Sequence, residues 1–166
     1  MAQPQQNSKI PQLTPYQVKE IETASPEQLL LILYDGAIRF LNIAKQCYEE
    51  KDWEGYSQLL IRAQKIVREF MITLDTTIVP EVANNLYRLY DYLHYQLVQA
   101  NIKREVTNID EVLGHLRDLR ATWAEAIKRA HQEGVTVGSQ LSARQMPTPA
   151  GAYGAAYENN STSYSV

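Results

Sequence analysis

The sequence predicts an all-α protein, an antiparallel up-down four-helix bundle that follows a short N-terminal helical segment. Apolar residues recur at alternating spacings of three and four over four long stretches, as on the buried faces of packed helices. The connections between these stretches are short, so consecutive helices lie antiparallel. A chain of 166 residues also has room for one domain whose core buries roughly two thirds of the unfolded surface.

The first long helix is expected from Pro26 to about Lys51. Ser25 can cap it, Pro26 suits its first position, and Gln28 can close a capping box with Ser25. This helix carries two adjacent apolar stripes, although a helix that packs on one side needs only one. The first stripe comprises Leu29, Leu33, Gly36, Phe40, Ala44 and Cys47, and the second comprises Leu30, Tyr34, Ile38 and Leu41.

Three further helices are expected along the chain. Asp52 is the expected N-cap of the second, which ends before the β-branched break that precedes Pro80. The third begins near Pro80, and the fourth follows a tight connection with Thr107 or Asn108 as its cap and ends at Gly134. Their main core faces are Leu59, Ala63, Ile66, Phe70 and Leu74; Val82, Leu86, Leu89, Leu93, Leu97 and Ala100; and Val112, Leu113, Leu116, Leu119, Trp123, Ile127 and Ala130.

Composition divides the chain into three parts. Residues 1–12 are rich in Gln and Pro and are expected to be a disordered leader. Residues 13–133 form the expected bundle domain, with 13–22 as a weakly held N-terminal cap segment that is too short to be a stable helix alone. Residues 134–166 are rich in Gly, Ala, Ser, Pro, Asn and Tyr, and we expect a disordered tail.

Charge and hydropathy exclude several classes of function. The net charge is −3, with acids and bases interspersed, so neither nucleic acid nor an anionic membrane surface is an expected partner. The longest apolar run, Leu29 to Leu33, is too short to be inserted across a membrane. No secretory signal is recognisable at the N-terminus, and the single cysteine, Cys47, fits a reducing compartment, so a cytosolic location is expected.

No constellation of residues indicates an enzyme, a metal or another cofactor. A di-iron bundle needs Glu-x-x-His on two helices, whereas Asp91 and His94 supply the wrong acid once, and Glu111 and His115 are four residues apart. His131 is explained as a favourable charge near a helix C-terminus. Glycine-rich phosphate loops and a Gly-x-Ser-x-Gly nucleophile motif are absent from the sequence.

The apolar second faces of the first three helices leave two interpretations open. The chain has eleven tyrosines, and these rings can pack in a thick core or face water singly. Alternatively, the second faces form a groove for an apolar segment of another protein, covered in its absence by residues 13–21. A further alternative is a structural bundle whose spare faces pair with copies of itself.

Several motifs resemble those of the flagellar secretion chaperone FliS family over about residues 16–130. The most specific are Thr-Ala-Ser-Pro at 23–26 and Leu-Tyr-Asp-Gly at 33–36. The other matching motifs are Tyr16 nine residues before Ser25, Arg62-Ala-Gln-Lys-Ile66, Asn85-Leu-x-x-Leu-Tyr-Asp-Tyr-Leu93, Ala100-Asn-Ile102, Asp110-Glu-Val-Leu113 and Leu119-Arg-x-x-Trp123.

The resemblance implies a cytosolic export chaperone that is a four-helix bundle without a cofactor. Its client would be the disordered C-terminal segment of flagellin, which it keeps from polymerising early and delivers to the flagellar export gate. A client that orders on binding gives up part of the interaction free energy, which keeps the complex releasable. A weak homodimer is the competing use of the same apolar faces.

The resemblance also implies functions for particular residues. Tyr16 and Ile21 belong to the mobile N-terminal segment, and Asp35 and Arg39 are either a surface ion pair or polar anchors for the client. The expected walls of the client groove, assigned mostly by helical spacing, are Leu30, Tyr34, Ile38, Leu60, Val67, Met71, Tyr87, Tyr90, His94 and Val98.

Overall fold

Five helices make up the computed structural model, which describes residues 10–134. They are α1 (Pro15–Thr23), α2 (Pro26–Glu49), α3 (Trp53–Thr73), α4 (Pro80–Lys103) and α5 (Val106–Gln132). The described residues contain no strand, so the predicted all-α fold is confirmed. Most of the expected leader, residues 1–9, and nearly all of the expected tail, residues 135–166, lie outside the described residues.

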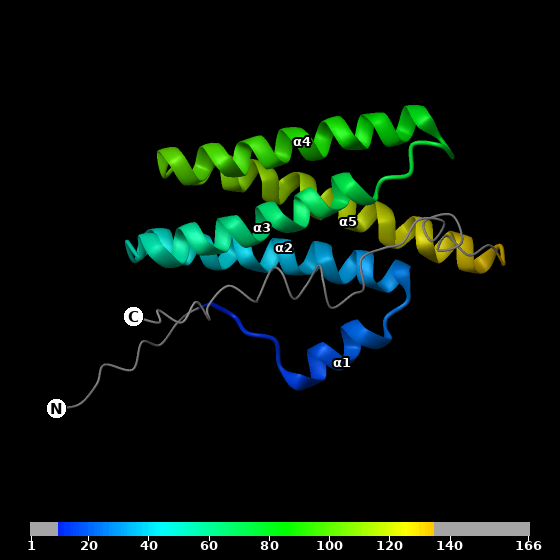
Figure 1. Cartoon of the computed structure of the whole chain (residues 1–166), viewed down its shortest axis with the longest axis horizontal. Coiled ribbons are helices and arrows are strands. Elements are labelled where there is room, and N and C mark those ends of the chain that lie inside the picture. Colours follow the sequence, from blue (N-terminus) through cyan, green and yellow to red (C-terminus); the bar gives the residue numbers. More distant parts are fainter. Residues whose placement is uncertain (1–9, 135–166) are drawn as a thin grey trace, which may run out of the picture.

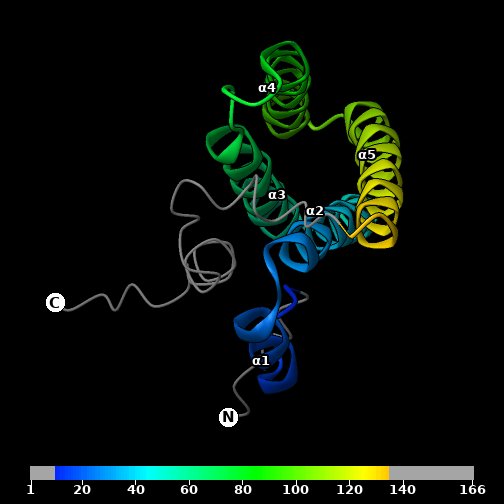
Figure 2. The same ribbon diagram turned by 90° about the vertical axis from the view of Figure 1, so that its right-hand side faces the viewer.

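Helices α2 to α5 form an antiparallel bundle, as the short connections predict. Figure 1 shows each of them running the length of the molecule in alternating directions. Viewed after a quarter turn, the four helices stand at the corners of a square in the order α2, α3, α4 and α5 (Figure 2). The extensive contacts follow the sides of the square: α2 with α3, α3 with α4, α4 with α5, and α5 with α2. Helix α1 lies outside the square beside α2, on the side away from α4 (Figure 2).

Hydrogen-bonded caps define where the first three helices begin. The Ser25 hydroxyl accepts from the Gln28 backbone N–H, and the Gln28 side chain accepts from the Ser25 backbone N–H, which completes the predicted capping box. Thr14 and Gln17 make the same box at the start of α1. Asp52 caps α3 through the Gly55 N–H, as predicted. Each box satisfies backbone donors that a helix start otherwise leaves unpaired.

The predicted cap of the last helix, Thr107 or Asn108, is wrong by two or three residues. Arg104 adopts the left-handed conformation, with φ of 56°, and turns the chain so sharply that Glu105 already stands at the N-cap of α5. Helix α5 therefore begins at Val106 and takes up Thr107 and Asn108 in its first turn. The Arg104 guanidinium lies 4.5 Å from the centre of the Trp53 ring, and this cation–π contact helps to hold the unusual backbone conformation.

One predicted core residue faces water. Val82 is exposed, and its neighbour Ala83 is buried instead. The three-and-four spacing that we assigned through Val82 fits Ala83 as well, because the next inward residues are Leu86 and Tyr90. Periodicity alone does not distinguish two such registers in the first turn of a helix.

Candidate partner-binding surface

The centre of the bundle is a cluster of aromatic rings with paired hydroxyl groups. The Tyr34 and Tyr90 hydroxyl oxygens are 2.5 Å apart, and Tyr34 stacks on Phe70 with ring centres 4.4 Å apart. Trp123 of α5 is partly buried against the same core. The Tyr56 hydroxyl donates to the Ala100 carbonyl oxygen at 2.8 Å. These contacts join α2, α3 and α5 to α4 and satisfy polar groups that burial would otherwise leave unpaired.

Burial makes these phenols harder to ionise. It is the main cause that raises the pKa of Tyr34, and the neighbouring Tyr90 adds to the effect. Burial also raises the pKa of Tyr90, against an opposing effect of its hydrogen bonds. For Tyr56, burial raises the pKa to about 12. Each phenolate would lose its hydration in the core, so the neutral form is favoured.

Four of the predicted groove walls lie in the core of the bundle. Tyr34, Leu60 and Val67 have no exposed surface, and Tyr90 is 2% exposed. In a square of four helices each helix packs against two neighbours, so α2 and α3 need apolar faces wide enough for both. The second stripe of α2 is therefore largely explained by the bundle, and in this conformation these four side chains have almost no exposed surface.

The other predicted groove walls retain surface but do not share one groove. Leu30 and Ile38 on α2, Met71 on α3 and His94 and Val98 on α4 are partly buried. Tyr87 on α4 is 47% exposed. Three of these residues, Tyr87, His94 and Val98, lie on α4, and they mark the surface where exposed apolar groups are most numerous.

Helix α4 presents an apolar outer surface, which we define by Tyr87, His94, Tyr95, Val98 and Ile102. Tyr87, Tyr95 and Ile102 are exposed and spaced eight and seven residues apart, which places them on one side of the helix. Ile102 is the most exposed of the three, at 72%. Such a stripe on a helix that is already packed on its other side is typical of a docking surface.

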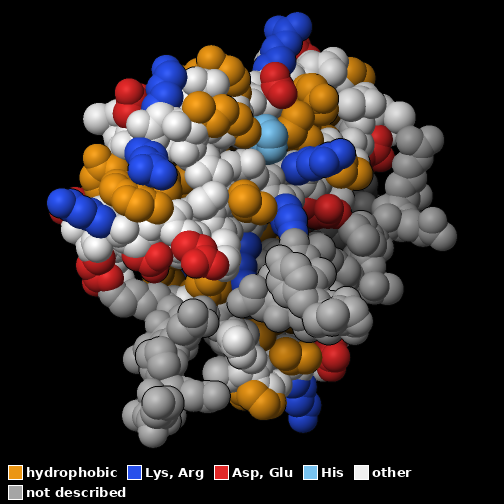
Figure 3. Space-filling model, turned by 60° about the vertical axis from the view of Figure 1, so that its left-hand side comes forward, with side chains coloured by type: hydrophobic (Ala, Val, Ile, Leu, Met, Phe, Trp, Pro, Cys, Tyr) orange, Lys and Arg blue, Asp and Glu red, His pale blue; other side chains and the backbone are white. Residues whose placement is uncertain are grey.

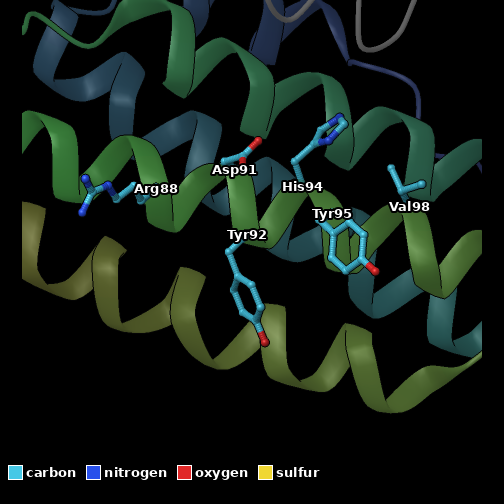
Figure 4. A pocket seen from close by; sticks show the side chains of 6 residues that line it. All are labelled: Arg88, Asp91, Tyr92, His94, Tyr95 and Val98. Atoms are coloured by element: carbon cyan, nitrogen blue, oxygen red, sulfur yellow. The ribbon is translucent and has the colours of Figure 1, made fainter.

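A shallow hollow of about 390 Å³ lies at the middle of this outer surface. Figure 4 shows that Tyr92 points from α4 towards α5, whereas His94 points to the opposite side of the helix. The hollow is lined by Arg88, Asp91, Tyr92, His94, Tyr95 and Val98. Its lining thus combines two tyrosine rings with an arginine, a histidine and one acid, a composition suited to a peptide rather than to a metal ion.

A network of polar side chains closes the α4–α5 side of the hollow. The Tyr92 hydroxyl donates to Glu111 at 2.5 Å, and the Gln96 amide donates to both Tyr92 and Glu111. Asn108 donates to the Gln96 carbonyl oxygen at 2.9 Å. The face of the molecule drawn in Figure 3 carries its hydrophobic side chains in separate groups with lysines, arginines and acids between them. A partner that crosses such a face has to combine apolar and polar contacts.

The N-terminal strap, residues 10–14, crosses the bundle before α1. Leu13 is partly buried against the core, and the Pro11 carbonyl oxygen accepts a hydrogen bond from Arg62 of α3 at 3.2 Å. In α1, Ile21 is buried, whereas Tyr16 is 76% exposed. The two residues that we predicted for a mobile segment therefore differ: Ile21 holds α1 to the bundle, and Tyr16 has no such contact with the core.

One sequence-based interpretation of charged residues is wrong, and another is incomplete. Asp35 pairs with Arg120 of α5 through two hydrogen bonds of 3.0 Å, not with Arg39, and the hydrogen bond to Asp35 raises the pKa of Arg120. His131 Nε2 lies 2.6 Å from Glu27 Oε2, so it links the end of α5 to the first turn of α2. Both partners are distant in sequence, and helical spacing within one helix cannot reveal them.

Chemical sites are not apparent in the part of the chain that the structure describes. Residues 10–134 contain no group of three or more His, Cys, Asp or Glu side chains that could hold a metal ion. A second hollow, beneath α1, has a volume of about 420 Å³ and is lined by Glu20, Thr23, Ala24, Gln28, Leu31, Ile32, Asp35 and Arg120. No helix among these residues is long and apolar enough to cross a membrane.

Two functional candidates escaped the sequence reasoning. Tyr95 is 57% exposed in the outer surface, but a tyrosine in a tyrosine-rich helix gives no distinct signal. Arg62 did have a recognisable sequence signal, because it stands beside Ala63 in the core stripe between Leu59 and Ile66. A charged residue at such a position indicates a buried polar contact.

Most of the chain is similar in sequence to proteins of one known family. Residues 9–130 match the model of a family described as flagellar protein FliS. The flagellar secretion chaperone FliS of Bacillus subtilis (strain 168) is 38% identical over 120 residues, which cover 72% of this chain and 89% of that protein. The protein of the same name from Salmonella typhimurium is 33% identical over 111 residues, 66% of this chain and 82% of its own.

Proposed function

Because the chain belongs to the FliS family of flagellar secretion chaperones, we propose that it binds the C-terminal segment of flagellin in the cytosol. The complex keeps that segment from polymerising before export and presents it to the flagellar export gate. The family is one of chaperones rather than enzymes. The observation that supports the proposal best is the α4 outer surface, which exposes Tyr87, Tyr95 and Ile102 along one side of a rigid helix.

Hydrophobic docking on this surface fits a client that is disordered until bound. Tyrosine and isoleucine side chains give large contact areas, and aromatic residues carry much of the binding energy in protein interfaces. The hollow around His94 and Val98 would accept one side chain of the client, with Arg88 and Asp91 at its rim for polar groups. The buried Tyr34, Leu60, Val67 and Tyr90 would then support the surface from beneath rather than touch the client.

A binding measurement tests the proposal. We expect the full chain to bind a synthetic peptide of the C-terminal segment of flagellin from the same bacterium, measured by isothermal titration calorimetry, and not to bind the N-terminal segment. The double change Tyr87→Ala and Val98→Ala should weaken binding about tenfold or more, because it removes two apolar anchors. Ile78→Ala, at a position of comparable exposure in the connection before α4 and outside both the outer surface and residues 10–22, is the matched control.

The competing function is self-association through the same surface. A stable homodimer in sedimentation equilibrium that the double change dissociates, together with no binding of the flagellin peptide, would contradict the chaperone proposal. A monomeric wild type that binds the peptide would support it. The double variant and the control variant should both keep normal helical content.

The N-terminal segment is proposed to compete with the client. If residues 10–22, which lie beside α2 and α3, occupy part of the path of an extended client, deletion of residues 1–22 speeds client association, measured by stopped-flow fluorescence. An unchanged association rate would remove the segment from the mechanism, while leaving the outer-surface proposal intact.

A further inference from the structure

Arg62 is a charged residue at a buried position of α3, where apolar residues are usual. Its side chain is 7% exposed, and it lies on the inward side of α3 next to Ala63. The guanidinium sits over the Phe40 ring, 5.9 Å from the ring centre. Burying a guanidinium is unfavourable unless hydrogen-bond acceptors replace the lost water. The acceptors of Arg62 are therefore needed to offset the desolvation of its side chain.

One of those acceptors is the main chain of the N-terminal strap. Arg62 Nη1 donates to the Pro11 carbonyl oxygen across 51 residues of sequence. A carbonyl group is the same in every residue, so this contact does not depend on the side chain at position 11. Any extended peptide that passes Arg62 can offer an equivalent acceptor, whereas a carbonyl inside a helix is already engaged by its own N–H partner.

The strap that carries this carbonyl is lightly packed. Ile10, Pro11 and Leu13 are only partly buried, and α1, which follows the strap, takes part in none of the extensive helix contacts of the bundle. Ile21 is the residue of α1 that is buried. The acceptor of a buried cation thus belongs to a segment that separates from the bundle at a small loss of packing.

We propose that Arg62 is a main-chain anchor for which the strap and an extended part of the client compete. When the strap leaves, a backbone carbonyl of the client takes the place of the Pro11 carbonyl, so the guanidinium keeps its acceptor in both states. This inference rests on the proposed function, since it assigns a contact of the same client.

A cycle of two substitutions in the full chain tests this. Leu13→Asp weakens the hold of the strap, and Arg62→Met keeps the length of the side chain without its donors. We expect Leu13→Asp to tighten binding of the flagellin C-terminal peptide, measured by fluorescence anisotropy. Arg62→Met added to Leu13→Asp should weaken binding about tenfold, because the client then loses its anchor and no strap is left to be released.

In the wild-type background we expect a smaller effect of Arg62→Met on affinity. There Arg62→Met removes both the hold on the strap and the anchor for the client, so the affinity changes by less than in the Leu13→Asp background. If Arg62 holds only the strap, Arg62→Met tightens binding in the wild type and has no effect beside Leu13→Asp, and the inference is overturned. Arg62→Lys, which retains a charged donor, should restore part of the affinity that Arg62→Met loses.

Two further measurements separate folding from binding. Circular dichroism shows whether Arg62→Met keeps its helical content. Should it unfold, the wild type suffices: the Arg62 side-chain N–H signals, followed by NMR with labelled arginine, should stay protected from exchange when the peptide binds, and a loss of protection overturns the inference. Peptide binding without any effect of Arg62 refutes only this anchor, whereas no binding by the wild type refutes the proposed function itself.

Discussion

Helices α2 and α4 have the same length and opposite surroundings. Each has 24 residues and begins with proline, yet α2 buries ten residues and α4 buries five. Both pack against α3 and α5, but α1 and the strap lie beside α2, whereas nothing among the described residues covers the outer side of α4. A wide apolar face therefore serves packing at one corner of the bundle and remains exposed at another.

For α2 the wide face serves stability. Its second stripe reaches the hydroxyl pair of Tyr34 and Tyr90 and the neighbouring helix α5. For α4 the corresponding residues are left in water, where large apolar groups contribute little to the free energy of unfolding. Their presence on the surface is better explained by a partner than by the fold.

The largest expected effect on the free energy of unfolding comes from truncating one aromatic residue near the middle of each helix, buried on α2 and exposed on α4. Phe40→Ala on α2 should lower the free energy of unfolding by about 3 to 5 kcal/mol, because it leaves a cavity in a fully buried position. Tyr95→Ala on α4 should change it by less than about 0.5 kcal/mol. Urea denaturation followed by circular dichroism measures both. A loss of more than 2 kcal/mol from Tyr95→Ala would place that residue in the structural core and break the comparison.

Alkaline pH should weaken the attachment of α4 to the rest of the bundle. Tyr56 donates to Ala100 of α4, and burial raises its pKa to about 12 from an ordinary value of 10.0. The unfolded chain loses this proton first, so the stabilisation is complete below pH 10 and falls as pH rises towards 12, by about 1.4 kcal/mol per pH unit for one group. The raised pKa values of Tyr34 and Tyr90 act in the same direction.

Denaturation at several pH values between 9 and 12 measures this effect against Tyr56→Phe. The variant lacks the ionisable group, so its stability should fall less steeply over this interval than that of the wild type. Parallel curves for the two proteins would show that Tyr56 ionises equally well in the folded and unfolded chains.

The smallest effect concerns the helix starts. Ser25→Ala should lower the free energy of unfolding by about 1 kcal/mol, because α2 loses its capping hydroxyl. Helix α4 begins at the same kind of X-Pro step, but Val79 makes no side-chain cap. The double change Val79→Ser and Val82→Gln copies the capping box of α2 and should raise stability by about 1 kcal/mol, measured by thermal and urea unfolding. No gain would mean that the backbone at Val79 cannot adopt cap geometry.

Much of the fold was predictable because its signals are local. The Ser25 capping box, the Asp52 cap and the break before Pro80 each depend on residues within a few positions of one another. The start of α5 and the burial of Val82 were predicted wrongly because both depend on how a helix is rotated or joined within the bundle. The roles of the predicted groove residues as client contacts stay predictions.

By itself the sequence determined the number, type and order of the helices, since periodicity, caps and breakers act over short distances along the chain. Only the tertiary structure decided which apolar stripes are surplus. Burial depends on how many neighbours each corner of the bundle has, so similar stripes became core on α2 and surface on α4. For the same reason the acceptors of Arg62 and the partners of Asp35 and His131 emerge only when distant segments are folded together.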